Sequence, residues 1–209
     1  MKALLCFHGF CGDKHNFDYI AKDIKLDYNL IYIPDLPGHG INKFRFCKKN
    51  ILSFVLSEYD KLKKSYEVID VIGYSLGGVL ASYLATYRKV NKLILISPAF
   101  IYTNISLNKI KYIKYSKKDF TLKKIYYFYE FCEITADIKR QIYKIFCPCL
   151  VIIGKKDQLI SFKSGFFGYK LVQNELRSYI EYELLDHYNI LQDRKVKEDI
   201  INFLNKKIN

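Results

Sequence analysis

The chain has 209 residues, 50% of them hydrophobic, so it can bury one sizeable core and is not intrinsically disordered. Lysine and arginine number 34 against 21 acidic residues, and the formal charge of +13 would attract an acidic partner. The chain is also crowded with Lys, Ile, Asn, Tyr and Phe, the residues of AT-rich codons, so charge alone identifies no partner and gives nucleic-acid binding no further support.

Neither a targeting signal nor a metal motif stands out. The apolar start of the chain meets His8 and Gly9 before the core of a signal peptide could form, and no later stretch has the length of a membrane span. The six cysteines lack the spacing of metal ligands. We therefore expect a soluble cytoplasmic protein with reduced thiols, and neither zinc nor disulfides.

Six short segments predict the strands of a parallel sheet, and the continuous apolar runs that begin the series are typical of strands buried on both faces. The six segments cover residues 3–7, 30–34, 68–73, 92–97, 149–154 and 179–185. Helical spacing lies between and after them, around 17–24, over 51–65, in VLASYLATYRKV after residue 78, in the region SFKSGFFGYKLVQNEL, and over 189–207. This alternation is typical of an α/β domain, whose ligand sites lie at the carboxyl ends of the strands.

The segment 99–146 has a different composition, because it is rich in Tyr, Phe, Ile and Lys and contains no Gly and no Pro. With so few turn signals it predicts two or three helices. It lies between the fourth and fifth strands. We expect it to form a small helical cap over the carboxyl edge of the sheet, while residues 1–98 and 147–209 form the core.

The sequence GYSLGG, residues 73–78, follows the third predicted strand and leads into a helix. A strand that ends in G-x-S-x-G and turns at once into a helix is a nucleophile elbow. Gly73 and Gly77 then allow close packing, and Ser75 lies on a strained turn with its hydroxyl exposed. The helix that begins at Leu76 directs free N–H groups and the positive end of its dipole at the site. Ser75 is therefore the candidate nucleophile, and the alternative is an inert serine in a plain strand-turn-helix.

A serine hydroxyl is a poor nucleophile unless an imidazole removes its proton and a carboxylate orients that imidazole. Asp157 follows the fifth predicted strand and His187 follows the sixth, which gives the chain order Ser, Asp, His expected for this architecture. Asp186 is a weaker rival for the carboxylate.

The other histidines have structural interpretations. His8 belongs to a Gly-containing turn that it more plausibly shapes, His39 lies in the turn PGHG, and His15 lies in a polar loop. None of them follows the last strand, so His187 is the preferred base.

The chain resembles the α/β-hydrolases almost end to end, in particular the small carboxylesterases and meta-cleavage-product hydrolases. The matching motifs are HGF after the first strand, DLPGHG after the second, GYSLGG after the third, G-x-x-D after the fifth and D-H after the sixth. The resemblance implies Ser75 as nucleophile, Asp157 as acid, His187 as base, and an oxyanion hole made by the backbone N–H groups of Phe10 and Leu76. It implies acyl transfer through an acyl-enzyme, without cofactor or metal.

Two departures from the family pattern affect the fold. The chain starts at the family's third strand, so the first antiparallel pair is missing and about six strands are expected. The cap, at under fifty residues by these boundaries, is short, which leaves the substrate class least defined.

The motifs HGF and DLPGHG resemble those of two subgroups of this family in particular. One removes the methyl group from pimeloyl-carrier-protein methyl ester in biotin synthesis, and we favour it. The other is the menaquinone-pathway lyase, the 2-succinyl-6-hydroxy-2,4-cyclohexadiene-1-carboxylate synthase, which needs converging cations, for which Arg45 and Arg88 are the nearest arginines. A non-catalytic binding protein of the same fold is the third alternative.

Candidate substrate-binding residues are Tyr74, Lys117, Lys118, Lys123 and Lys124. Tyr74 either lines the pocket or packs the elbow. The lysines of the cap would dock an acidic acyl carrier protein, or they form an ordinary solvated helix surface.

Overall fold

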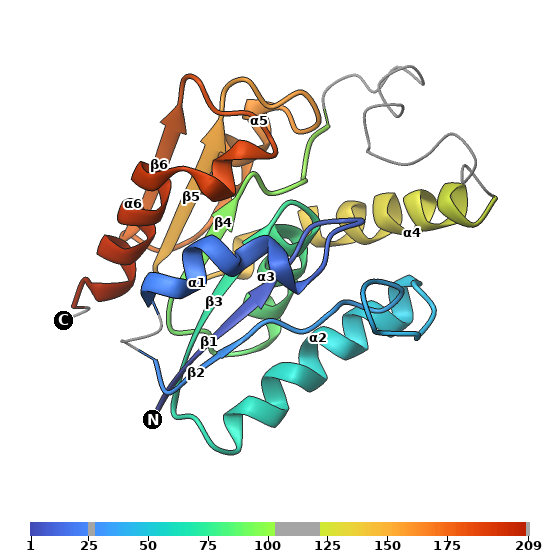
Figure 1. Ribbon diagram of the computed structural model, residues 1–209, viewed down its shortest axis with the longest axis horizontal. Helices are drawn as coiled ribbons and strands as arrows, with labels where there is room; N and C mark the ends of the chain where they lie inside the picture. Colours follow the sequence, from blue (N-terminus) through green and yellow to red (C-terminus); the bar gives the residue numbers. More distant parts are fainter. Residues whose placement is uncertain (25–27, 103–121, 208–209) are drawn as a thin grey trace.

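Six strands form one sheet in the computed structural model, which describes residues 1–24, 28–102 and 122–207 (Figure 1). Their order is β2-β1-β3-β4-β5-β6, and every neighbouring pair is parallel. The strands are β1 (Lys2–Phe7), β2 (Leu30–Tyr32), β3 (Val68–Tyr74), β4 (Leu93–Ile96), β5 (Cys149–Gly154) and β6 (Arg177–Tyr182). The predicted α/β fold with a parallel sheet of about six strands is confirmed.

The strand order reverses beside β1, and this reversal positions the site. The chain leaves β1 toward β2 on one side and returns to β3 on the other. Phe7 at the end of β1 is in register with Gly73 near the end of β3. The loops that follow β1 and β3 therefore start side by side at a topological switch point, where open α/β sheets bind their ligands.

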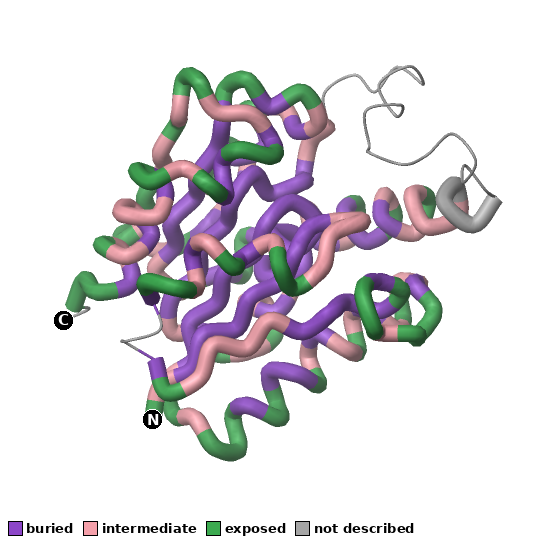
Figure 2. Tube along the Cα trace, in the orientation of Figure 1, coloured by how far each residue is buried: buried purple, intermediate pink, exposed green. Residues whose placement is uncertain are grey.

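Helices cover both faces of the sheet. The helices α1 (Asp18–Ile24) and α6 (Arg194–Asn205) pack on one face, and α2 (Lys48–Lys63), α3 (Leu76–Tyr87) and α5 (Phe162–Leu171) pack on the other (Figure 1). The inner strands β1, β3, β4 and β5 are buried along most of their length, whereas the edge strands β2 and β6 are partly exposed (Figure 2). This double burial explains why the inner strands are mostly continuous apolar runs rather than alternating ones.

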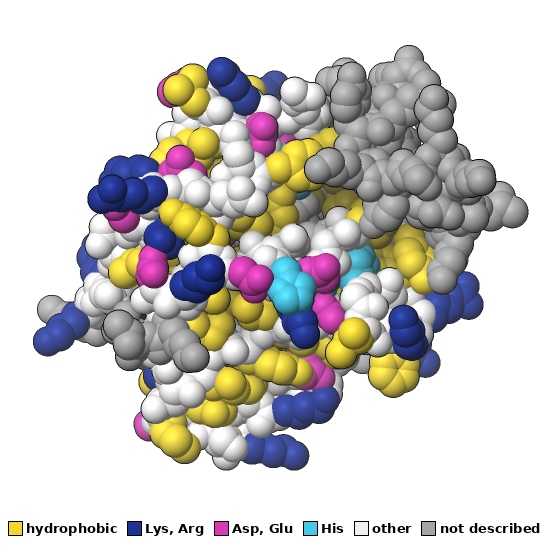
Figure 3. Space-filling view, in the orientation of Figure 1, with side chains coloured by type: hydrophobic (Ala, Val, Ile, Leu, Met, Phe, Trp, Pro, Cys, Tyr) yellow, Lys and Arg dark blue, Asp and Glu magenta, His cyan; other side chains and the backbone are white. Residues whose placement is uncertain are grey.

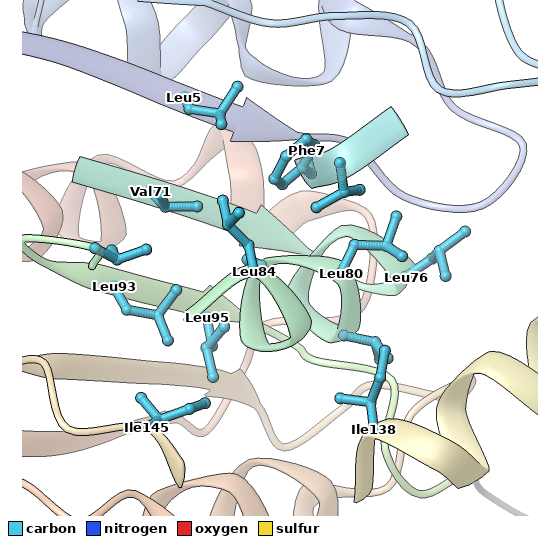
Figure 4. Close-up of a cluster of buried hydrophobic side chains, with 14 of the residues drawn as sticks. Leu5, Phe7, Val71, Leu76, Leu80, Leu84, Leu93, Leu95, Ile138 and Ile145 are labelled. Carbon is cyan, nitrogen blue, oxygen red and sulfur yellow. The ribbon is translucent and has the colours of Figure 1, made fainter. Parts of the chain in front are cut away.

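Successive side chains of each strand point to opposite faces of the sheet. In β1, Leu4 and Cys6 pack toward α1 and α6, whereas Leu5 and Phe7 pack toward α2 and α3. Figure 4 shows the cluster on the face that α2 and α3 cover. In it Leu5, Phe7 and Val71 of the sheet meet Leu76, Leu80 and Leu84 of α3, with Ile138 and Ile145 beyond them.

The described part of segment 99–146 contains one α-helix, α4 (Leu122–Lys139), and a 3-10 turn, η5 (Ile142–Lys144). The helix packs against α2 and α3. Ile134, Ile138 and Ile142 are buried in the same cluster as the sheet. Residues 103–121 of the predicted cap lie outside the described residues, and the division into core and cap at 99 and 146 stays a prediction.

Several predicted boundaries differ from the structure by a few residues. Strand β6 begins at Arg177 and ends at Tyr182 rather than covering 179–185. The last helix begins at Arg194 rather than at 189, because the Asp193 side chain accepts a hydrogen bond of 3.0 Å from the Val196 N–H and caps it. Residues Asn189–Gln192 form the 3-10 turn η6. No described helix is long and apolar enough to cross a bilayer.

Candidate active site

Ser75 lies on a sharp turn between β3 and α3. Its φ of 55° and ψ of −117° place a non-glycine residue in a strained conformation. A Cβ atom at Gly77 would lie 1.8 Å from the carbonyl oxygen of Phe7, and one at Gly73 would lie 2.2 Å from the carbonyl oxygen of Gly77. Only glycine fits at these two positions, because the elbow brings backbone against backbone.

The Ser75 side chain is less accessible than the motif predicts. Ser75 is 6% exposed, whereas the hydroxyl of an elbow serine was expected to be exposed. The HGF loop is the reason, since a Cβ atom at Gly9 would lie 3.3 Å from the Ser75 Cβ and 3.1 Å from the Tyr74 ring. The loop that follows β1 thus covers the elbow directly.

A chain of hydrogen bonds joins Ser75, His187 and Asp157. The Ser75 Oγ lies 3.1 Å from His187 Nε2, and His187 Nδ1 donates to Asp157 Oδ2 over 2.6 Å. A carboxylate can only accept here, so it holds the proton on Nδ1 and leaves Nε2 free to accept from the hydroxyl. The structure thus brings together the three predicted side chains from the ends of β3, β5 and β6.

The backbone fixes Asp157 in this position. Its Oδ1 accepts hydrogen bonds from the N–H groups of Leu159 at 2.9 Å and Ile160 at 2.8 Å, which leaves Oδ2 for the imidazole. Asp186, the rival carboxylate, instead accepts from the N–H groups of Tyr188 and Asn189, each at 2.8 Å. The imidazole of His187 is therefore paired with Asp157.

Tyr74 forms a hydrogen bond with the backbone of His187. Its hydroxyl donates to the carbonyl oxygen of His187 over 2.5 Å, and the two rings lie 5.1 Å apart between centroids. Burial raises the pKa of Tyr74 well above its ordinary value, so the phenol stays a hydrogen-bond donor. Of the two interpretations that the sequence left open, this geometry favours a packing role at the elbow.

The predicted oxyanion donors lie where the switch point places them. Leu76 is the first residue of α3, and Phe10 belongs to the loop that covers Ser75. Among hydrogen bonds within the described residues, none uses the backbone N–H of Phe10 or Leu76. An oxyanion hole requires two such N–H groups, and this role of Phe10 and Leu76 stays a prediction.

Neutral histidines hold the HGF loop in place, a role that sequence reasoning located only in part. His8 donates from Nδ1 to the Gly9 carbonyl oxygen at 2.9 Å and accepts at Nε2 from the Leu36 N–H at 3.0 Å. His39 accepts at Nε2 from the Cys11 N–H at 3.0 Å. Burial lowers the pKa of both imidazoles, that of His39 to about 4. His15, predicted to be a solvated loop residue, is exposed.

Asp35, which sequence reasoning did not single out, organises the DLPGHG turn. Its carboxylate accepts from the N–H groups of Lys14 and Ile41, each at 3.1 Å. Burial acts to raise the pKa of Asp35, but these hydrogen bonds together with nearby positive charge lower it overall. Gly40, with a φ of 50°, is required because a Cβ atom there would lie 2.3 Å from this carboxylate.

An aromatic cluster borders the HGF loop. The Phe10 ring stacks on Phe131 of α4 at 5.4 Å between centroids and meets the edge of Phe46 at 5.6 Å. Tyr102 meets Phe131 at 5.5 Å. The site is therefore bordered by apolar side chains from the loop after β1, the loop before α2, and α4.

The predicted substrate-binding role of the cap lysines stays a prediction. Lys117 and Lys118 lie outside the described residues, and Lys123 and Lys124 fall in the first turn of α4. Arg88 pairs with Asp60 at 2.7 Å, and Arg45 lies over the Tyr126 ring at 4.7 Å. Among the described residues, no group of three His, Cys, Asp or Glu side chains could hold a metal ion.

Comparison with known proteins agrees with this architecture. The sequence matches the family described as alpha/beta hydrolase fold over residues 2–113, more than half of the chain. The protein therefore belongs to the α/β hydrolase fold family. It is similar to a carboxylesterase of Bacillus subtilis strain 168, with 22% identity over 228 aligned positions that cover 98% of this chain and 93% of the carboxylesterase.

Solved structures share the fold at low sequence identity. A structure reported for the metagenome-derived lipolytic enzymes LipS and LipT has a TM-score of 0.80 at 16% identity and covers 98% of this chain and 94% of its own. The meta-cleavage product hydrolase of Pseudomonas fluorescens IP01 has a TM-score of 0.71 at 17% identity, with 98% and 91% covered.

Proposed function

We propose that the protein is a serine hydrolase that cleaves a carboxylic ester or thioester through an acyl-enzyme on Ser75. The observation that carries the proposal is the hydrogen-bond chain from Ser75 through His187 to Asp157 at the carboxyl edge of the sheet. The family and the similarity to a carboxylesterase along nearly the whole chain support a hydrolase of the esterase and lipase kind. The intact chain of hydrogen bonds argues against a non-catalytic binding protein.

The proposed acyl transfer assigns one role to each group of the site. His187 Nε2 takes the proton of the Ser75 hydroxyl as Oγ attacks the carbonyl carbon, and Asp157 stabilises the resulting imidazolium. The backbone N–H groups of Phe10 and Leu76 bind the oxyanion. His187 then gives its proton to the leaving alcohol or thiol, activates a water molecule for attack on the acyl-enzyme, and returns the proton to Ser75.

The substrate that we favour carries an apolar acyl chain. The rings of Phe10, Phe46 and Phe131 beside the HGF loop support this preference, since an apolar chain gains free energy by leaving water there. The specific version is a pimeloyl-[acyl-carrier protein] methyl ester esterase. Its support is the net charge of +13 and the lysines at 117, 118, 123 and 124, which would attract an acidic carrier protein.

The menaquinone-pathway lyase has less support. Such a reaction needs free cations that converge on a substrate with several carboxylates. Arg88 is neutralised by Asp60 through two hydrogen bonds of 2.7 and 2.8 Å, and Arg45 is exposed and stacked on Tyr126. No contact within the described residues brings either arginine to Ser75.

Hydrolysis of p-nitrophenyl butyrate tests the general proposal. We expect turnover by the wild-type protein, a loss of at least about 10⁴-fold in kcat/KM for Ser75→Ala, and labelling by a fluorophosphonate probe that the variant abolishes. Equal activity in the two proteins, with no labelling of Ser75, would refute it.

Binding to acyl carrier protein tests the specific version. We expect retention on immobilised acyl carrier protein in low salt and release in about 0.5 M salt, because the shorter Debye length screens the attraction between exposed charges. We also expect the protein to release methanol from the carrier-bound methyl ester. An active esterase that neither binds the carrier nor releases methanol would leave the general proposal standing and reject this substrate.

A further inference from the structure

The loop between the DLPGHG turn and α2 exposes two large hydrophobic side chains close together. Ile41 is 79% exposed and Phe44 is 72% exposed. Single exposed hydrophobic residues are common, but these two are three positions apart, and Lys43 and Arg45, which flank Phe44, are also exposed. We call residues 41–45 the apolar tip.

The backbone of the apolar tip is held by hydrogen bonds. The Ile41 N–H donates to Asp35 Oδ2 at 3.1 Å, and the Phe44 N–H donates to Asn42 Oδ1 at 3.1 Å. The Asn42 amide donates in turn to the Asp35 carbonyl oxygen at 2.9 Å. Because the two side chains are presented on a pre-ordered loop, a binding partner would not have to order the loop first.

The apolar tip stands beside the candidate active site. Phe46, which ends the loop, packs on His39 at 5.4 Å and on Phe10 at 5.6 Å between ring centroids. On the other side, Arg45 lies over Tyr126 of α4 at 4.7 Å. The tip therefore lies between the HGF loop and α4. Hydrophobic and basic side chains lie side by side where this loop precedes α2 (Figures 1 and 3).

We propose that the apolar tip docks the protein on the surface of an anionic lipid bilayer. Ile41 and Phe44 would enter the boundary between head groups and acyl chains, while Lys43 and Arg45 meet the lipid phosphates. The net charge of +13 adds long-range attraction to such a surface. Docking would bring the candidate active site next to the bilayer, where esters with long acyl chains are dissolved.

The same observations favour a bilayer over a protein partner. Specific protein interfaces bury about 800 Å² on each side and centre on well-packed pockets. Two protruding side chains that alternate with cations offer a smaller apolar area. Partial insertion into a lipid interface needs only that area and nearby positive charge.

Vesicle flotation tests the proposal on the full chain. The vesicles are phosphatidylcholine with phosphatidylglycerol in equal parts, or phosphatidylcholine alone. We expect binding to the anionic vesicles that salt weakens, and a loss of about five- to tenfold in the partition coefficient for Ile41→Ser and for Phe44→Ser. Lys43→Ser should lose about fivefold on anionic vesicles and nothing on neutral ones.

Phe146→Ser is the matched control. Phe146 is 67% exposed and lies two positions after Lys144, which is also exposed. Because Phe146 precedes β5, it lies toward the amino ends of the parallel strands, whereas the apolar tip follows the carboxyl end of β2. This variant should bind like the wild type. Ile41→Ser and Phe44→Ser keep the N–H groups that hold the loop, and circular dichroism should show an unchanged fold.

Three outcomes would overturn the proposal. They are absence of binding to anionic vesicles, an equal loss for Phe146→Ser, and binding to acyl carrier protein through Ile41 and Phe44 in preference to vesicles. Flotation needs no catalysis, so a protein that binds vesicles but hydrolyses no ester would sustain this proposal while refuting the proposed function.

Discussion

The imidazole Nε2 of His39 accepts a hydrogen bond of 3.0 Å from the backbone N–H of Cys11, the residue that follows the candidate oxyanion donor Phe10. Its other nitrogen, Nδ1, donates to the carbonyl oxygen of Pro37 at 3.1 Å. Only the neutral imidazole can accept at Nε2 and donate at Nδ1 together. The turn after β2 thus holds the HGF loop in place through an uncharged histidine.

Stability should fall as the pH is lowered from 6.5 to 4. Burial, assisted by His8, lowers the pKa of His39 to about 4, against about 6.5 in the unfolded chain. Above pH 6.5 the imidazole is neutral in both states. Between pH 6.5 and pH 4 this imidazole binds a proton in the unfolded state but not in the folded state, so the free energy of unfolding decreases until pH 4. The loss should be on the order of 2 to 3 kcal/mol, measured by urea denaturation across this range.

His39→Gln separates this effect from general acid denaturation. An amide oxygen can still accept from the Cys11 N–H, but glutamine does not titrate. The variant should therefore lose less stability between pH 6.5 and 4 than the wild type. An identical pH profile would show that His39 is not the group responsible.

Replacing Asp157 by Asn should impair hydrolysis, and replacing Asp186 by Asn should not. In Asp157→Asn the amide can present an N–H to His187 and disfavour the tautomer that accepts from Ser75, so kcat should fall about 10²- to 10⁴-fold. Asp186→Asn retains a side-chain oxygen for the N–H groups of Tyr188 and Asn189 and should keep nearly full activity. Initial rates on p-nitrophenyl butyrate measure both. The reverse result would move the acid role to Asp186.

The elbow should not tolerate a single added methyl group at Gly77. A Cβ atom there would lie 1.8 Å from the carbonyl oxygen of Phe7, and the backbone of β1, which is paired with a strand on each side, cannot move aside cheaply. Gly77→Ala should cost about 3 kcal/mol or more of unfolding free energy. Gly168→Ala in α5, where the nearest atom lies 3.1 Å away on the Phe100 ring, should change it by less than about 1 kcal/mol. Similar losses in both would refute the steric argument.

Lys92 should stabilise the carboxyl end of α6. Its Nζ donates to the carbonyl oxygens of Phe203, Leu204 and Lys206, at 3.1, 2.5 and 2.5 Å. These acceptors have no partner inside the helix, and a cation there also interacts favourably with the helix dipole. Lys92→Met should cost about 1.5 to 3 kcal/mol in thermal or urea unfolding. Lys89→Met, at an exposed position nearby, should cost almost nothing.

The fold was largely predictable because its signals are local. The inner parallel strands are mostly continuous apolar runs, and turn residues mark the ends of the strands, so all six strands were located within a few residues. The errors fall where a side chain sets a boundary. Asp193, for example, starts α6 later than the apolar spacing suggests, because it caps Arg194–Asn205.

The sequence by itself determined which residues follow each strand, and hence that Ser75, Asp157 and His187 share one edge of a parallel sheet. Only the tertiary structure decided which of them touch, because the distances between their side chains depend on strand order and register rather than on spacing along the chain. The reversal of strand order beside β1 sets the HGF loop over the elbow. Long-range packing likewise brings His39 to Cys11, 28 positions away, and exposes Ile41 and Phe44, which composition alone would have assigned to a core.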